Sequence, residues 1–162
     1  MVIRLFYSLL FFTCTNFFYS QEIPNISLQT LDGEKLNISQ IDTSTPVVLV
    51  FWATWCLPCM EELTNINDKY DQWQKEEKFT IYAVSTDDSR TSSKVKSIVK
   101  SRGWPYKILL DQNQALKRSL NINSIPYLIV LHRGKIVYSH IGYALGDEDD
   151  LFTKIKACYK NL

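Results

Sequence analysis

The chain is poor in histidine and has only one pair of closely spaced cysteines. Its 162 residues include two histidines, His132 and His140, and four cysteines, of which Cys56 and Cys59 are separated by two residues. A structural zinc site takes four thiolate or imidazole ligands at short spacings. No second Cys-x-x-Cys pair and no histidine pair at such a spacing completes one, so we expect no metal.

The chain also lacks a charge excess and a basic cluster. It carries 18 Lys and Arg residues against 17 Asp and Glu residues, a formal net charge of +1 at pH 7. Nucleic acids and acidic membrane surfaces are bound through clustered Lys and Arg side chains. The composition therefore indicates no nucleic-acid partner.

Long hydrophobic runs, repeats and linker-like tracts are absent as well. The length suits one domain, and a hydrophobic content of 46% supplies a sizeable core. The first residues carry one charge, Arg4, followed by an apolar run from Leu5 to Phe12 that is too short to cross a bilayer comfortably. This order predicts a signal peptide at residues 1–20 and one domain at residues 21–162. An uncleaved N-terminal anchor is the alternative, because Phe18 is bulky for its place before the cut.

The cysteine pair lies at a predicted strand-to-helix junction. The apolar run from Val47 to Trp52 predicts a buried strand, and a helical pattern opens at the cysteines. If Cys56 is the N-cap of that helix, unpaired backbone N–H groups favour its thiolate, while Cys59 lies one turn further in and is covered. The pKa of such a thiol falls from about 8.5 toward about 7 or lower. We therefore predict that Cys56 attacks disulfides and Cys59 resolves the product.

Two other interpretations of the pair are a purely stabilising disulfide and half of a zinc site. A loop of this length closes little chain entropy, and the other zinc ligands are missing. Pro58 fits the first turn of a helix, where its missing N–H has no partner to lose.

The rest of the chain alternates predicted strands and helices. A hairpin is predicted between residues 26 and 38, turned by Asp32-Gly33. Further strands are predicted at residues 79–85, 107–110, 127–131 and 135–141, and helices from the cysteines to about residue 75 and at residues 95–102, 114–120 and 147–159. This order predicts an α/β fold with a central mixed sheet covered by helices on both faces.

These motifs, taken in order, resemble the thioredoxin superfamily over residues 22–162. The carriers are the strand before the cysteines, the Ile125-Pro126 step and the closing hairpin and helix. More specific features are similar to the TlpA/ResA-type extracytoplasmic thiol-disulfide oxidoreductases: the N-terminal hairpin, Phe51-Trp52-Ala53-Thr54-Trp55-Cys56, Leu110-Asp111 and Gly134-Lys135-Ile136. The resemblance implies a thioredoxin-like fold and a redox disulfide between Cys56 and Cys59.

The resemblance also implies which residues bind a substrate. In the family, the proline that matches Pro126 follows a cis peptide bond and faces the cysteines, so backbone groups of Ile125 and Tyr127 would pair with a substrate chain. From the sequence alone an ordinary trans proline at a strand start is favoured. Trp55 is expected to shield the thiols, and Pro58, just before the second cysteine, is similar to reducing members of the family.

Glu62 is the predicted proton acceptor beside the thiols. Thioredoxin has a buried aspartate beneath its cysteines, and the matching position here is Val50. At about 100° per residue, Glu62 lies about 90° from the centre of the apolar stripe of its helix, whereas Glu61 lies about 170° from it. Glu62 also follows Cys59 by one helical turn and matches the active-site glutamate of ResA-like proteins. Partial burial and a nearby thiolate would raise its pKa. A surface acid near a helix N-terminus is the alternative.

Together these expectations describe an exported enzyme that reduces disulfide bonds. The resemblance implies oxidised exported proteins, such as apocytochrome c, as substrates, a thiol carrier in the membrane as electron donor, and a periplasmic location. We expect a monomer with no cofactor. One alternative is a peroxiredoxin-like thiol peroxidase, which expects a threonine three residues before its cysteine, where this chain has Ala53. The other is a copper-binding module on the same fold, which prefers a wider cysteine spacing.

Overall fold

The computed structural model describes residues 23–160. The predicted signal peptide at residues 1–20, and the anchor that is its alternative, lie outside this range. Within residues 23–160, none of the helices combines the length and the apolar composition that a membrane span requires.

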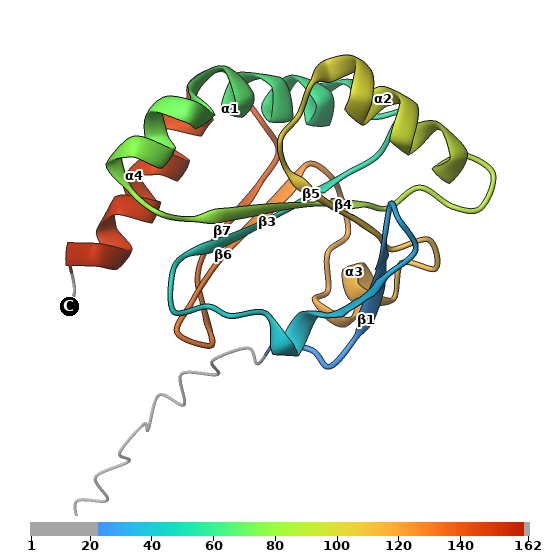
Figure 1. Ribbon diagram of the computed structural model, residues 1–162, viewed down its shortest axis with the longest axis horizontal. Coiled ribbons are helices and arrows are strands. Elements are labelled where there is room, and N and C mark those ends of the chain that lie inside the picture. The colour runs from blue at the N-terminus through green and yellow to red at the C-terminus, as the bar shows by residue number, and fades with distance from the viewer. Residues whose placement is uncertain (1–22, 161–162) are drawn as a thin grey trace, which may run out of the picture.

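Seven strands form one mixed sheet (Figure 1). Their order across the sheet is β2-β1-β5-β4-β3-β6-β7. Strands β3, β4 and β5 are parallel, whereas β6, β7 and the hairpin strands β1 and β2 pair antiparallel with their neighbours. The strands are β1 (Ser27–Thr30), β2 (Lys35–Asn37), β3 (Val47–Trp52), β4 (Thr80–Ser85), β5 (Lys107–Leu110), β6 (Tyr127–His132) and β7 (Lys135–Ile141). The predicted mixed sheet and N-terminal hairpin are confirmed.

Helices cover both faces of the sheet. Figure 1 shows α1, α2 and α4 over one face and the short α3 beneath the other. The helices are α1 (Leu57–Glu76), α2 (Val95–Arg102), α3 (Ala115–Ser119) and α4 (Asp147–Lys160), with 3-10 turns η1 (Ile38–Gln40) and η2 (Ser92–Lys94). Gly103 ends α2 in the left-handed conformation, with φ of 64°, which glycine adopts without the penalty that a Cβ atom brings.

Strand β3 is buried on both faces because each face meets its own core. Its alternate residues Val48, Val50 and Trp52 pack with residues of α1, α2 and α4. The other three, Val47, Leu49 and Phe51, pack with residues of η1 and α3 on the opposite face. No residue of β3 is more than 1% exposed. The strand is thus held between two packed layers up to its last residue, which fixes the point from which the cysteine loop departs.

Candidate active site

The chain passes directly from β3 through a tight turn into the cysteine pair. The backbone N–H of Cys56 donates to the carbonyl of Ala53 at 3.0 Å, and α1 begins one residue later. Cys56 is the N-cap of α1, as predicted: its Sγ accepts a hydrogen bond from the backbone N–H of Cys59 at 3.3 Å. Pro58 lies in the first turn of α1. The backbone N–H of Cys59 therefore points at the Cys56 sulfur, and the position at the helix start favours negative charge on it.

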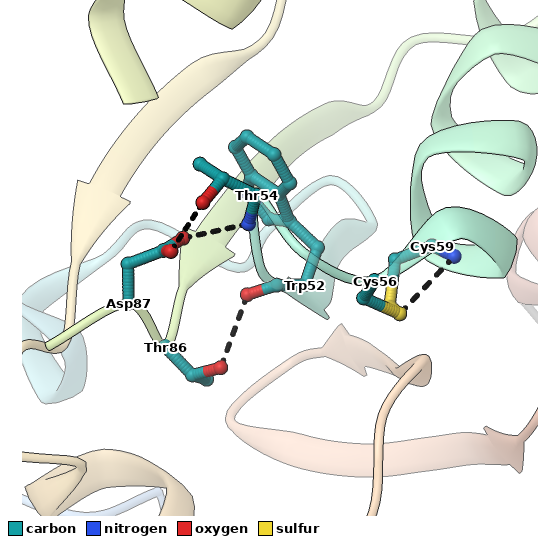
Figure 2. The surroundings of a disulfide bond; sticks show 6 residues. All are labelled: Trp52, Thr54, Cys56, Cys59, Thr86 and Asp87. Carbon is teal, nitrogen blue, oxygen red and sulfur yellow. Dashed lines mark hydrogen bonds between the residues drawn. A yellow bond between two sulfur atoms is a disulfide. The ribbon is translucent and has the colours of Figure 1, made fainter. Parts of the chain in front are cut away.

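Cys56 and Cys59 form a disulfide, with their Cα atoms 5.3 Å apart (Figure 2). Cys59 is 0% exposed and Cys56 only 5% exposed. The prediction of a covered Cys59 is confirmed. The prediction of an accessible Cys56 is wrong in degree for the oxidised protein, because its side chain closes onto Cys59 and packs into the buried cluster with Ala53. Cys56 is still the more exposed of the two cysteines, as predicted.

The Ile125-Pro126 step lies beside the end of β3 that carries the cysteines. Its peptide bond is cis, as the resemblance implied. The next residue, Tyr127, pairs with Phe51 of β3, five residues before Cys56. Pro126 is buried, while Ile125 and Tyr127 are half-buried. The structure therefore brings this step and the cysteine pair to the same end of the sheet.

Glu62 is more deeply buried than the partial burial that the sequence predicted. It is 3% exposed, and its Oε2 atom has no hydrogen-bond partner within the described range. Glu61 is exposed, so the helical geometry distinguished the two acids correctly. Burial, and then the negative charges of Asp147 and Glu148, raise the pKa of Glu62 to about 8. At neutral pH Glu62 is therefore mostly protonated.

A network of hydrogen bonds and ion pairs joins helix α4 to α1. Lys69, two turns after Glu62, donates to Glu148 at 3.1 Å and to Asp149 at 2.7 Å. The hydroxyl of Tyr143 donates to Glu148 at 2.9 Å. These contacts keep the first turn of α4 and its acids against the face of α1 that carries Glu62.

A second buried acid near the cysteines was not predicted from the sequence. Asp87, two residues after β4, is 1% exposed and accepts hydrogen bonds from the backbone N–H of Thr54 at 2.9 Å and from its hydroxyl at 2.6 Å (Figure 2). Its signal in the sequence is an acid soon after a strand with an apolar centre, where an uncompensated charge would not be tolerated.

Exposed apolar side chains surround this end of the molecule. Trp55 is 64% and Leu57 is 74% exposed, on either side of Cys56. Ile141, the strand partner of Tyr127, is 59% exposed, and Leu145 in the following loop is 81% exposed. We call these four residues the apolar rim. Only Trp55 among them was predicted, because exposure of the other three follows from where β7 ends and where α1 begins.

Metal and cofactor ligands were not predicted, and the described residues form no cluster of three or more His, Cys, Asp or Glu side chains that could hold a metal ion. His140, one of the two histidines, pairs instead with Asp147, with Nε2 and Oδ2 3.2 Å apart. What the site offers chemically is a dithiol couple, a buried acid and an apolar surface.

The proteins to which this chain is similar include thiol-disulfide oxidoreductases. A match to the AhpC/TSA family covers residues 19–139. The thioredoxin-like protein YneN of Bacillus subtilis is 32% identical over 126 residues, which cover 75% of this chain and 71% of that protein. The thiol-disulfide oxidoreductase ResA of Bacillus thuringiensis is 29% identical over 123 residues, covering 75% and 69%.

A solved structure extends the match over most of the chain. That of a thioredoxin-like protein from Porphyromonas gingivalis is 35% identical, covers 87% of this chain and 94% of that one, and has a TM-score of 0.76. Because the family match spans well over half of the sequence, the chain belongs to the AhpC/TSA family and is a ResA-like thiol-disulfide oxidoreductase with a thioredoxin fold.

Proposed function

We propose that this protein reduces disulfide bonds in exported proteins through a mixed disulfide on Cys56. The observation that carries the proposal is the Cys56–Cys59 disulfide at the N-terminus of α1, with Cys56 as N-cap. In the reduced protein the Cys56 thiolate attacks a substrate disulfide, and one substrate sulfur leaves as a thiol. Cys59 then attacks Cys56, which closes the protein disulfide and releases the second substrate thiol.

The order of the two attacks follows from the helix start. The Cys56 sulfur accepts a backbone N–H and lies at the positive end of the helix dipole, so its thiolate is stabilised. Cys59 is fully buried, and no substrate sulfur reaches it before Cys56 has reacted. Cys59 therefore acts second, on a sulfur that is already its neighbour.

Substrate binding is assigned to the surface around Cys56. Trp55, Pro58 and the step from Ile125 to Tyr127 contact the substrate chain, and the other residues of the apolar rim add apolar area. Backbone pairing with a strand-like substrate needs an extended segment beside the cysteines, and Ile125-Pro126 lies there. The rim favours substrate segments with apolar side chains next to the disulfide.

Glu62 is proposed to hold and return the proton of the thiol pair. Its pKa of about 8 lies close to that of an ordinary thiol, about 8.5, and proton exchange is most effective when the two values match. Glu62 follows Cys59 by one helical turn on α1, so the two side chains are neighbours.

The Glu62 role is tested by thiol alkylation against pH. Glu62→Gln keeps the shape of the side chain but cannot exchange a proton, so we expect the pH dependence of alkylation of the reduced pair to shift. Glu61→Gln, on the exposed side of the same helix, is the matched control and should leave the profile unchanged. Equal shifts in both variants would remove the special role of Glu62.

Export, a periplasmic location, a thiol-based electron donor in the membrane and apocytochrome c among the substrates belong to the same proposal. Their support is the sequence of residues 1–20 and the resemblance to extracytoplasmic thiol-disulfide oxidoreductases. In such a compartment thiols become oxidised, so an enzyme that reduces disulfides there must receive electrons from outside the compartment.

Trapping tests the attack order directly. Cys59→Ser protein, reduced and mixed with a disulfide-bonded peptide, should form a stable mixed disulfide on Cys56 that peptide mapping locates. Cys56→Ser protein is the matched control and should trap little. More adduct on Cys59 in the Cys56→Ser protein than on Cys56 in the Cys59→Ser protein would contradict the proposal.

A thiol peroxidase is the competing function, and peroxide turnover by the same Cys59→Ser protein tests it. The threonine nearest to Cys56 does not face it as a peroxidase would require: the Thr54 hydroxyl donates to Asp87. Cys59→Ser protein should therefore turn over peroxide no faster than an ordinary free thiol does. Rapid oxidation of Cys56 by peroxide would favour the peroxidase instead.

A further inference from the structure

Asp87 is a buried carboxylate whose charge is balanced by hydrogen bonds alone. It is 1% exposed, and the ion pairs within residues 23–160 involve other acids. Its Oδ1 accepts from the Thr54 hydroxyl at 2.6 Å, and its Oδ2 accepts from the Thr54 backbone N–H at 2.9 Å and the Ser85 hydroxyl at 2.9 Å. Keeping a charge in such a place is costly unless the surrounding donors are fixed.

Thr86, the residue before Asp87, also binds the chain shortly before the cysteines. The backbone N–H and the hydroxyl of Thr86 both donate to the carbonyl of Trp52, at 2.8 and 3.1 Å. Figure 2 shows both sets of hydrogen bonds, between Thr86 and Trp52 and between Asp87 and Thr54. Two consecutive residues after β4 thus hold the last residue of β3 and the residue two positions before Cys56. We call these hydrogen bonds, from Thr86 to Trp52 and from Thr54 to Asp87, the loop clamp.

None of the groups that form the loop clamp belongs to Cys56 or Cys59. In the oxidised protein the Cys56–Cys59 bond itself ties Cys56 to α1. That bond is open whenever the enzyme is ready to attack a substrate. The loop clamp and the hydrogen bond from the Cys56 N–H to Ala53 hold the chain before Cys56 without using either sulfur.

We propose that Asp87 is a positioning residue that acts through Thr54: it holds the segment before Cys56 so that the reduced sulfur stays at the N-terminus of α1. The inference rests on the proposed role of Cys56 as the attacking thiol. Asp87 itself takes no part in the chemistry. Its effect reaches the reaction through the alignment of Cys56 with the N–H groups that favour the thiolate.

Asp111 offers a matched control within the same fold. It is also fully buried and directly follows a parallel strand, β5, but its carboxylate accepts from the backbone N–H groups of Leu116 and Lys117 at 3.2 and 2.9 Å. It therefore caps α3, on the face of the sheet away from α1. Loss of its charge should destabilise the protein without touching the cysteine loop.

The test measures alkylation of Cys56 against pH in the reduced protein, with the site located by peptide mass spectrometry, alongside thermal melting. Thr54→Val removes the hydroxyl donor and keeps the carboxylate, and Asp87→Asn removes the charge. In both variants we expect the Cys56 profile to move to higher pH, with a rate at pH 7 lower by about threefold, since half a pKa unit corresponds to about that factor. Asp111→Asn should melt at a lower temperature with an unchanged profile.

Each other result would overturn the inference. An unchanged profile in Thr54→Val, an equal shift in Asp111→Asn, or a move to lower pH in Asp87→Asn would show that Asp87 does not position Cys56. If Asp87→Asn does not fold, Thr54→Val decides alone. A wild-type protein in which Cys56 reacts no faster than a free cysteine would instead remove the proposed function, so the two failures are distinguishable.

Discussion

The raised pKa of Glu62 makes stability depend on pH. Folding moves the pKa from 4.5 to about 8, so the folded state binds a proton that the unfolded state releases between these values. The free energy of unfolding should therefore fall as pH rises from about 5 to about 8, by an amount on the order of a few kcal/mol. Glu62→Gln should remove this part of the slope, which urea unfolding at a series of pH values measures.

Glu61→Gln is the control for this prediction as well. Because Glu61 is exposed, its replacement should leave the slope of stability against pH as in the wild type. A slope that Glu62→Gln leaves unchanged would show that the Glu62 carboxylate is already ionised in the folded protein, which contradicts a pKa of about 8.

Glu62 also shows how far helix geometry carries a prediction about one side chain. The angle from the apolar stripe separated Glu62 from Glu61, and the structure places the first inside and the second outside. The depth of burial was not predictable from that angle. It depends on α4, whose acids Asp147 and Glu148 come against α1 through contacts far apart in the sequence.

Single-residue exposure was the least predictable property of the chain. Cys56 was expected to be accessible because an N-cap stands at the open end of a helix, yet the disulfide draws its side chain into the core cluster. Asp87 was missed because its partner Thr54 is 33 positions away in the sequence. Pairings of this kind follow from the register of β3 with β4, which no local pattern contains.

Helices and strands were predicted well because their periodicity is local. The strand at β3 and the helix after the cysteines both follow from spacing and cap residues. The 3-10 turn η2 was not predicted, because a single turn has too few residues to show a period. The cis bond before Pro126 came from the resemblance, since local sequence favours trans.

One aromatic pair joins α1 and α4 in the core. Trp73 of α1 and Phe152 of α4 stack with ring centroids 4.7 Å apart and an interplanar angle of 6°, and both are almost fully buried. Phe152→Ala removes this stack and leaves a cavity, so we expect a loss of about 3–5 kcal/mol in the free energy of unfolding.

Chemical denaturation measures that loss, and Leu145→Ala is the comparison. Leu145 is 81% exposed, so its truncation should change stability by no more than about 0.5 kcal/mol. A loss in Phe152→Ala no larger than that in Leu145→Ala would show that the stack does not hold α4 in place.

The whole molecule places its chemistry where neighbouring segments end together. Parallel strands β3 and β4 finish at the same edge of the sheet, so the cysteine loop and the loop clamp meet there, and β6 begins beside them with the cis proline. The strand order that makes this possible was not predicted from the sequence, because hydrophobic patterns give strands but not their neighbours.

A reducing function requires that Cys56 and Cys59 form a reversible dithiol couple poised to donate electrons. The most direct measurement is the reduction potential of this couple in a dithiothreitol or glutathione series, made in a Cys158→Ser background because Cys158 is a free thiol within the described residues. We predict one two-electron transition at about −270 mV or lower. A value near about −120 mV would contradict the reducing direction, and the absence of a reversible transition would contradict the couple itself.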